Sequence, residues 1–342
     1  MKKLLFISLF GLVCSSCFST SITTTNPSSS PAIDDSKYQM IIDNRFEHGF
    51  DVSPGSGSNP DTGWFPEERW TKNVDICPTQ GDTPIWMLSQ HGDIYSLNDH
   101  YNKYGGDRYN TTVPDEDGYY TFYDESKKVS VNPSKGACYL ELNTSQEYER
   151  PRKSGEQWCH ILLNEGFQKA VQVKEIDECI LTIDLTMKKF EDHMNGLADS
   201  SLHATQFLMY LVMKSNNPAE DSGFFWFGIP FFDNRYPNGL PESGMIDAGG
   251  AGATSKFIYS MPSADYMEDK TLILNKTCSI EVDIKPYILN GLILAQEKGF
   301  FLNSTFEDLC FQSMNIGFEI PGTYDCGIEM SNFSLTAYYT EE

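Results

Sequence analysis

The sequence predicts a mostly β chain that folds as an antiparallel β-sandwich of the jelly-roll type, with long loops and one or two short helices. Three observations support this prediction. Short apolar runs recur between polar turns from Gly118 onward, two-residue alternation is clear in several of them, and helical periodicity is scarce. Residues 37–342 are expected to form this domain, and its N-terminal part, residues 37–117, is rich in loop-forming Gly, Pro, Asp and Asn.

The clearest strand pattern lies at residues 180–188. Four apolar residues alternate there with polar ones: Leu181, Ile183, Leu185 and Met187. Successive side chains of a strand point to opposite faces, so this segment should have one buried face and one wet face. Residues 280–284 repeat the pattern.

Two longer segments, 207–213 and 223–232, are apolar almost throughout. They predict neighbouring strands at the centre of a sheet, with one face in the core and the other under loops or a ligand. Near Ser331 and Asn332 the apolar positions change from even to odd, which predicts a β-bulge. One helix is expected to begin near Pro286 and to end at Gly299.

The N-terminus carries the features of an export signal. Lys2 and Lys3 precede an apolar run of about ten residues, which is too short to span a bilayer. The small residues before Cys17 resemble a bacterial lipoprotein signal, and the resemblance implies that residues 1–17 are a signal and that Cys17 receives the lipid. Cys14 departs from that pattern, because an aliphatic residue is usual there; the alternative is an ordinary signal peptide cut nearby.

Residues 18–36 are rich in Ser, Thr, Pro and Asn and predict a flexible tether. The chain is therefore expected to be exported to the cell envelope and to contact the membrane only through its lipid. The formal charge is −23, and removal of the two signal lysines would make it −25. Such a charge disfavours nucleic acid as a partner and is compatible with neutral ligands.

Seven cysteines follow the signal region, an odd number with wide spacings that match no zinc pattern: Cys77, Cys138, Cys159, Cys179, Cys278, Cys310 and Cys326. No metal site is predicted from them. Cysteine packs well as a small apolar residue, so several should be free and buried, Cys159 and Cys179 among them.

The segment from Trp226 to Tyr236 is the richest candidate for ligand binding. An apolar strand ends there in Asp233, Asn234 and Arg235. Aromatic rings can stack on the apolar face of a sugar, while carboxylate and guanidinium groups bind hydroxyls. The alternative is structural, with an Asp233–Arg235 pair that fixes the strand end to a loop.

A second group of candidates consists of Trp158, His160, His203 and Gln206. Trp158 and His160 share one face if they lie on a strand. His160 is a candidate general acid or base, with Arg235 as a second catalytic candidate, but a hydrogen-bonded core histidine is the structural alternative. If these four residues met Trp226, Asp233 and Arg235 on one face, a binding function would be favoured.

Two further motifs carry acidic residues that could serve in catalysis or in metal binding. Glu281 and Asp283 resemble the start of the Glu-x-Asp-x-x-Glu motif of jelly-roll β-glucanases, but Pro286 stands where the third carboxylate would be, so a solvated face is favoured. Residues 115–118 offer oxygen ligands for calcium without the full spaced loop, and a solvated turn is favoured. No cofactor is predicted.

Strand density and aromatic-rich, Asn/Asp-rich loops over residues 80–340 resemble a jelly-roll, concanavalin-like carbohydrate-associated protein. Together with the expected tether, the acidic charge and the segment from Trp226 to Tyr236, this resemblance leads to the hypothesis of a surface lipoprotein that binds neutral glycans without catalysis. The expected ligand-binding residues are Trp158, His203, Gln206, Trp226, Asp233, Arg235 and Tyr236. A polysaccharide lyase or glycoside hydrolase, and a structural or adhesive envelope protein, remain alternatives. Whether the chain is an enzyme stays open.

Overall fold

The structure is a computed structural model that describes residues 36–63, 69–79, 81–104, 113–220, 223–248 and 253–340. The expected signal at residues 1–17, with Cys17, and the expected tether up to residue 35 lie outside the described residues. Within the described part, no helix is both long and apolar enough to cross a membrane.

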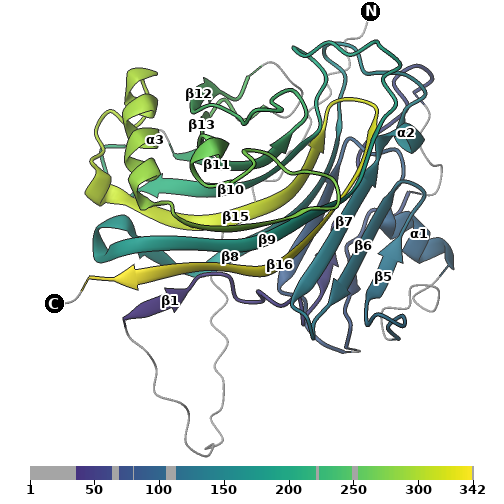
Figure 1. The fold of residues 1–342 in the computed structure, drawn as a ribbon, viewed down its shortest axis with the longest axis horizontal. Coiled ribbons are helices and arrows are strands. Elements are labelled where there is room, and N and C mark those ends of the chain that lie inside the picture. The colour runs from purple at the N-terminus through teal and green to yellow at the C-terminus, as the bar shows by residue number, and fades with distance from the viewer. Residues whose placement is uncertain are drawn as a thin grey trace, which may run out of the picture. The chain divides into compact units, whose positions relative to one another are not determined.

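Two sheets make up the fold (Figure 1). The seven-stranded sheet contains, in spatial order, β14 (Thr277–Asp283), β9 (Ile176–Asp192), β16 (Tyr324–Tyr339), β7 (Ala137–Asn143), β6 (Lys127–Asn132) and β5 (Tyr120–Tyr123), and β1 (Lys37–Gln39) also pairs with β16. The nine-stranded sheet contains β12 (Ser243–Ile246), β13 (Phe257–Ser260), β11 (Phe224–Asp233), β10 (Gln206–Ser215), β15 (Leu309–Ile320), β8 (Cys159–Gln172), β4 (Trp86–His91), β2 (Phe50–Val52) and β3 (Val74–Ile76).

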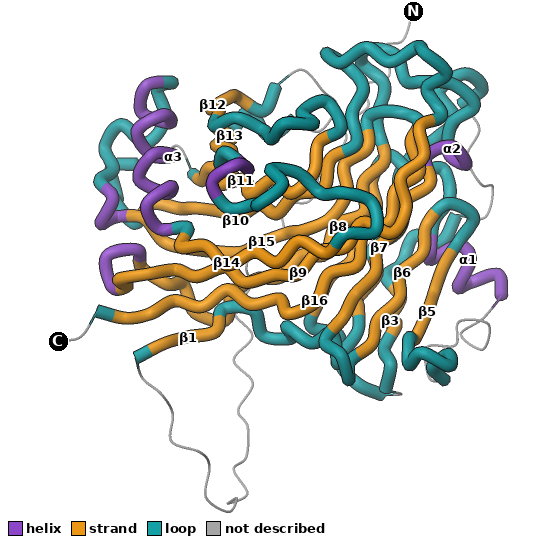
Figure 2. The backbone as a smooth tube through the Cα atoms, viewed as in Figure 1, coloured by secondary structure: helices purple, strands orange, loops and turns teal. Residues whose placement is uncertain are grey.

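The predicted β-sandwich of jelly-roll type is confirmed. From β7 to β10 and again from β14 to β16, consecutive strands alternate between the two sheets, so each sheet is built from strands that are not neighbours in sequence. Most pairs are antiparallel; β2–β4 and β11–β13 are parallel. Figure 2, which traces the backbone as a tube, shows long, curved strands in orange and short helices in purple.

The strand predictions hold in detail. The alternating segment at 180–188 lies within β9, whose residues Leu181, Ile183 and Leu185 are fully buried. The two apolar runs form β10 and β11, which pair antiparallel inside the nine-stranded sheet. The predicted bulge is also present, because the register of β16 on β9 shifts between Ser331 and Ser334 and Asn332 has a φ of 50°.

The helices are α1 (Leu97–Tyr104), α2 (Thr144–Glu147) and α3 (Lys285–Glu297), with short 3-10 turns η2 (Val173–Glu175), η3 (Ser263–Asp265) and η4 (Phe306–Asp308). The predicted helix is α3. Pro286 lies in its first turn, where a missing N–H costs nothing, and Gly299 follows its end with a φ of 87° that glycine adopts without strain.

A single apolar core lies between the sheets and fixes which strand faces point inward. Trp86, at the start of β4, is fully buried between the rings of Phe46 and Phe333, with centroids 5.7 and 6.4 Å away. Its indole N–H donates to the Asp43 carbonyl oxygen at 2.9 Å, so the buried donor is satisfied. All seven cysteines of the described residues are free, and Cys159 and Cys179 are buried, as predicted.

Candidate functional site

The nine-stranded sheet has one face on the core and one face turned away from it, here called the open face. On β8, for example, Cys159, Ile161 and Leu163 are fully buried, while the alternate residues His160, Leu162 and Asn164 keep partial exposure. The same alternation continues through β10, β11 and β15, so the open face is a consequence of two-residue periodicity.

A row of polar side chains crosses the open face at one register. It is called the polar row and consists of His91 on β4, His160 on β8, Glu319 on β15, Gln206 on β10 and Asp233 on β11. Each member is the direct cross-strand partner of the next. Directly paired residues point to the same face, so five adjacent strands present one continuous line of polar groups.

His160 and Glu319 form an ion pair at the middle of this row. His160 Nε2 lies 3.5 Å from Glu319 Oε2, and the two side chains are 17% and 23% exposed. His160 Nδ1 lies 3.0 Å from the Trp158 carbonyl oxygen, which can only accept, so Nδ1 carries a hydrogen. A neutral ring would then turn a lone pair on Nε2 toward a carboxylate, and this geometry favours the doubly protonated imidazolium.

The pKa shifts of the pair agree with that geometry. Burial alone would lower the pKa of His160, but the charge and hydrogen bond of Glu319 outweigh it and raise the pKa. Burial likewise acts to raise the pKa of Glu319, and the charge of His160 overcomes it and lowers the pKa. His160 is therefore a positively charged partner of Glu319 rather than a free general base.

Asp233 and Arg235 form the pair that the sequence offers as its structural alternative. The guanidinium of Arg235 donates from Nε to Asp233 Oδ1 at 2.9 Å and from its terminal nitrogen to Oδ2 at 2.5 Å. Gln206 also donates to Asp233 Oδ2, at 3.0 Å, and Asp233 is 4% exposed. The carboxylate is thus held at the strand end, while the amide of Gln206 is anchored in the polar row beside Glu319.

An aromatic group occupies another part of the open face, where β10 and β11 pair. The Tyr210 and Trp226 rings lie 5.7 Å apart, and Phe224 meets Trp226 edge-on at 5.0 Å. Gly228 is the cross-strand partner of Tyr210, and a Cβ there would lie 2.8 Å from the Tyr210 ring. The missing side chain leaves space for the ring of Tyr210 beside Trp226.

The polar row and the aromatic group are separated along the strands. Trp226 and Asp233 are seven residues apart on β11, or roughly 23 Å at 3.3 Å per residue. Leu162, Gly317 and Leu208 lie at the register next to the polar row. Four of the sequence candidates, His160, Gln206, Trp226 and Asp233, therefore share one face but not one small pocket.

Not all of the sequence candidates present a free group on this face. His203 is 6% exposed; its Nδ1 accepts the Asp199 N–H at 2.9 Å and its Nε2 lies 2.8 Å from the Arg152 carbonyl oxygen. Both ring nitrogens of His203 are therefore used within the chain. Trp158 precedes β8, with its ring 5.4 Å from that of His160. Tyr236 is 39% exposed in the turn after β11, 5.7 Å from the Arg235 guanidinium.

A small hollow next to Asp233 does not provide an enclosed site. Pro230, Phe232, Tyr236 and Lys270 are among the residues that line it. It has no room for a water molecule, so ligand binding at this end would take place on the open face itself.

Sequence reasoning missed the residues that complete the face, namely Glu319, His91, Tyr210, Asn164 and Asn315. Glu319 was one dispersed carboxylate among several, and nothing in its neighbourhood along the chain selects it. The signal lies in cross-strand register, since β15 pairs with both β8 and β10. Asn315 pairs with both Asn164 and Tyr210 and leaves its buried Oδ1 without a hydrogen-bond partner.

Both carboxylates of the polar row are held in ion pairs, so neither is a free acid, base or nucleophile for glycoside cleavage. Glu319 and Asp233 lie on strands separated by β10, so their backbones are roughly 10 Å apart, and each is already ion-paired. Asp283 belongs to the other sheet, where its Oδ1 accepts the N–H groups of Cys179 and Lys285. Asp115 Oδ1 accepts the N–H groups of Asp117 and Tyr119, so residues 115–118 form the predicted turn.

Comparisons with known proteins give no family. No family model matches the chain, and no curated protein matches it in sequence. Among solved structures, the chain is similar to endoglucanase Cel12A from Rhodothermus marinus, with 13% identity over 65% of this chain and 93% of the other, at a TM-score of 0.36.

Two further structures match to the same extent. The native family 12 xyloglucanase from Bacillus licheniformis has 14% identity over 65% and 94% of the two chains, at a TM-score of 0.36. The xyloglucanase domain of NopAA, a type three effector from Sinorhizobium fredii in complex with cellobiose, has 16% identity over 65% and 93%, at 0.35. TM-scores of 0.35 and 0.36 are too low to support an inference about this chain, so its fold and function rest on the structure itself.

Proposed function

We propose that this protein binds an extended, neutral glycan on the open face of its nine-stranded sheet. The observation that carries the proposal is the placement of the aromatic group and the polar row on one face of adjoining strands, roughly 20 Å apart. A monosaccharide could contact only one of them. A chain of several sugar units would contact both.

Each part of the face has a role in this proposal. Tyr210 and Trp226 stack on apolar sugar faces, and the indole N–H of Trp226, now 3.3 Å from Thr254 Oγ1, holds that ring in place. The Gln206 amide and the His160–Glu319 pair bind hydroxyls. The acidic surface disfavours anionic polymers, and binding needs no cofactor.

Isothermal titration of the full chain against neutral polysaccharides and their oligosaccharides tests the proposal. Trp226→Ala should weaken binding about tenfold, the equivalent of about 1.4 kcal/mol, because a stacking ring is lost. Tyr123→Ala is the matched control, since Tyr123 is 48% exposed on the other sheet. A folded protein that binds none of the polymers, or equal losses in the two variants, would contradict the proposal.

A lyase or hydrolase is the second candidate, and its motivation is the partly exposed His160–Glu319 pair. The ion pairs His160–Glu319 and Asp233–Arg235 leave no free acid or base in the polar row, which favours binding over catalysis. Incubation of the protein with each bound polysaccharide distinguishes the two. New reducing ends that disappear in His160→Ala would establish catalysis, and an unchanged polymer would support binding alone.

The proposed location of the protein is the envelope surface, with a lipid on Cys17 and residues 18–36 as the tether. The support is the sequence pattern at the N-terminus. Mass spectrometry of the N-terminal peptide from the native host tests it. A diacylglyceryl or acyl mass on Cys17, absent in Cys17→Ala, is the expected result; an unmodified peptide that starts elsewhere would refute it.

A further inference from the structure

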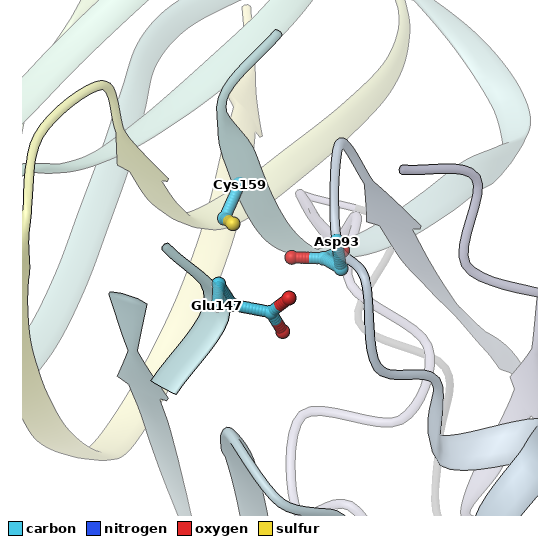
Figure 3. A group of neighbouring side chains, drawn as sticks. All are labelled: Asp93, Glu147 and Cys159. Carbon is cyan, nitrogen blue, oxygen red and sulfur yellow. The ribbon is translucent and has the colours of Figure 1, made fainter. Parts of the chain in front are cut away.

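A group of ionisable side chains lies on the inner side of the sheet, behind the polar row. Cys159 is the residue before His160 and points to the core, Asp93 follows β4, and Glu147 ends α2. Figure 3 shows that the three side chains, from three separate segments, point toward one another. One ligand atom from each lies within 4.8 Å of the others, and all three residues are buried.

The buried charges around this group do not balance. Asp93, Asp124 and Glu147 carry three negative charges when ionised, and Lys127 carries one positive charge. Both members of the Lys127–Asp124 ion pair have side chains with 0% exposure. Burial of a charge without a partner costs several kcal/mol, so another positive charge or bound protons must compensate.

Lys127 has no donor left for Asp93. Its ammonium lies 2.9 Å from the Tyr95 carbonyl oxygen, 3.0 Å from Ser126 Oγ, 3.0 Å from Asp124 Oδ2 and 3.3 Å from Glu147 Oε1. An ammonium has three N–H groups, and these partners use them all.

Asp93 is the unexplained member of the group. It is 0% exposed, and neither of its carboxylate oxygens has a hydrogen-bond partner. Two free acceptor oxygens in the interior, pointed at a thiol and a second carboxylate, are what a cation would satisfy.

We propose that Asp93, Glu147 and Cys159 bind a structural zinc ion. Zinc accepts thiolate and carboxylate ligands together, whereas calcium and magnesium take oxygen alone, so the sulfur of Cys159 selects the metal class. Glu147 is already oriented: Ser126 Oγ and Lys127 Nζ donate to its Oε1, and the N–H groups of Ile94 and Tyr95 donate to its Oε2 at 2.6 and 3.2 Å. Such outer partners fix the direction of a ligating carboxylate.

Charge is conserved when the metal binds. Zinc takes the place of two protons, one from the Cys159 thiol and one from the carboxyl of Asp93, and both protons go to solvent. The net charge of the buried group is then unchanged, while the oxygens of Asp93 and the sulfur gain a partner. The group is fully buried, so we expect zinc to enter during folding and to leave only on unfolding.

The decisive measurement is the metal content of the full chain. Protein unfolded and refolded with zinc should retain about one ion per chain after dialysis, whereas protein refolded with a chelator should hold none and melt at a lower temperature. Refolding with cobalt should produce a thiolate-to-metal absorption band in the near ultraviolet. Equal metal content and melting temperature after both treatments would overturn the proposal.

Two variants locate the site. Cys159→Ala should abolish the cobalt band and the retained zinc, and Cys179→Ala is the control, because Cys179 is an equally buried thiol far along the sequence on β9. Asp93→Asn distinguishes a bound zinc ion from a protonated Asp93. If zinc is bound, the variant should lose the ion and melt at a lower temperature than the wild type. If Asp93 is instead a protonated carboxyl, the isosteric amide should leave the melting temperature unchanged or raise it, which would refute the site.

Discussion

Similar charged groups lie on the two sides of the nine-stranded sheet under different physical conditions. On the open face, His160 and Glu319 pair at 3.5 Å with 17% and 23% of their side chains exposed. In the interior behind the inner face, Lys127 on β6 of the seven-stranded sheet pairs with Asp124 at 3.0 Å and with Glu147 of α2 at 3.3 Å, all at 0% exposure. Cys159 and His160 are consecutive residues, yet one belongs to each environment.

The difference shows how solvent decides the role of a charge. Water near the open face screens the ion pair and can be replaced there by the hydroxyls of a ligand, so the polar row is suited to reversible binding. The inner group is out of reach of solvent, and each of its charges must be compensated within the fold. A binding surface and a structural centre can therefore share one strand.

The largest effect should follow from Lys127→Met, which keeps the length of the side chain and removes its charge. Burial alone would lower the pKa of Lys127, but the neighbouring carboxylates outweigh it and keep the lysine charged. Without it, Asp124 and Glu147 remain buried and unpaired, and we expect the free energy of unfolding to fall by about 3–5 kcal/mol. Urea denaturation measures this change.

Lys128→Met is the matched control for that variant. Lys128 is the next residue on β6, its side chain is exposed, and its ammonium lies 5.7 Å from the Tyr139 ring. The control should change the unfolding free energy by no more than about 0.5 kcal/mol. Similar losses of unfolding free energy in the two variants would mean that removal of the buried charge costs no more than removal of an exposed one.

A second test of the inner face uses pH. Glu165, on the buried side of β8, is 3% exposed and accepts the Ile42 N–H at 2.7 Å. Burial raises its pKa to about 7. The unfolded chain therefore loses this proton at lower pH than the folded chain, so stability falls as pH rises from about 4.5 to about 7 and the loss persists above.

Glu165→Gln removes that penalty and should be more stable than the wild type by about 2–3 kcal/mol at pH 8, with little difference near pH 4. Thermal unfolding across this pH range gives both values. Glu178→Gln, an exposed carboxylate of β9, serves as the control and should show no such trend. A Glu165→Gln variant that is less stable at pH 8 would contradict the assignment.

Patterns within single segments of the sequence predicted three strands and one bulge of the fold. The alternation of apolar and polar residues at 180–188 predicted part of β9, and the two apolar runs predicted the paired strands β10 and β11. The change of the apolar positions from even to odd near Ser331 predicted the bulge. These features arise within one segment, because the identity of successive side chains decides which face is buried.

The candidate site depends on register between distant segments, which the sequence does not show. Glu319 meets His160 only because β15 lies beside β8, at a sequence separation of 159 residues. The inner group is hidden in the same way. Lys127 and Lys128 are consecutive residues that point to opposite faces of β6, so one ammonium is fully buried and the other is exposed. Glu147, which pairs with the buried ammonium, comes from α2 and is 20 residues away in sequence.

The smallest effect is expected on the open face, from Glu319→Gln. The substitution keeps the shape of the side chain and removes its charge, so it should lower the free energy of unfolding by about 1 kcal/mol or less. A double-mutant cycle with His160→Gln isolates the coupling between the two side chains, which should be of the same size. A coupling as large as the loss in Lys127→Met would show that the open face is as desolvated as the inner one, and the proposed role of the polar row in reversible binding would then fail.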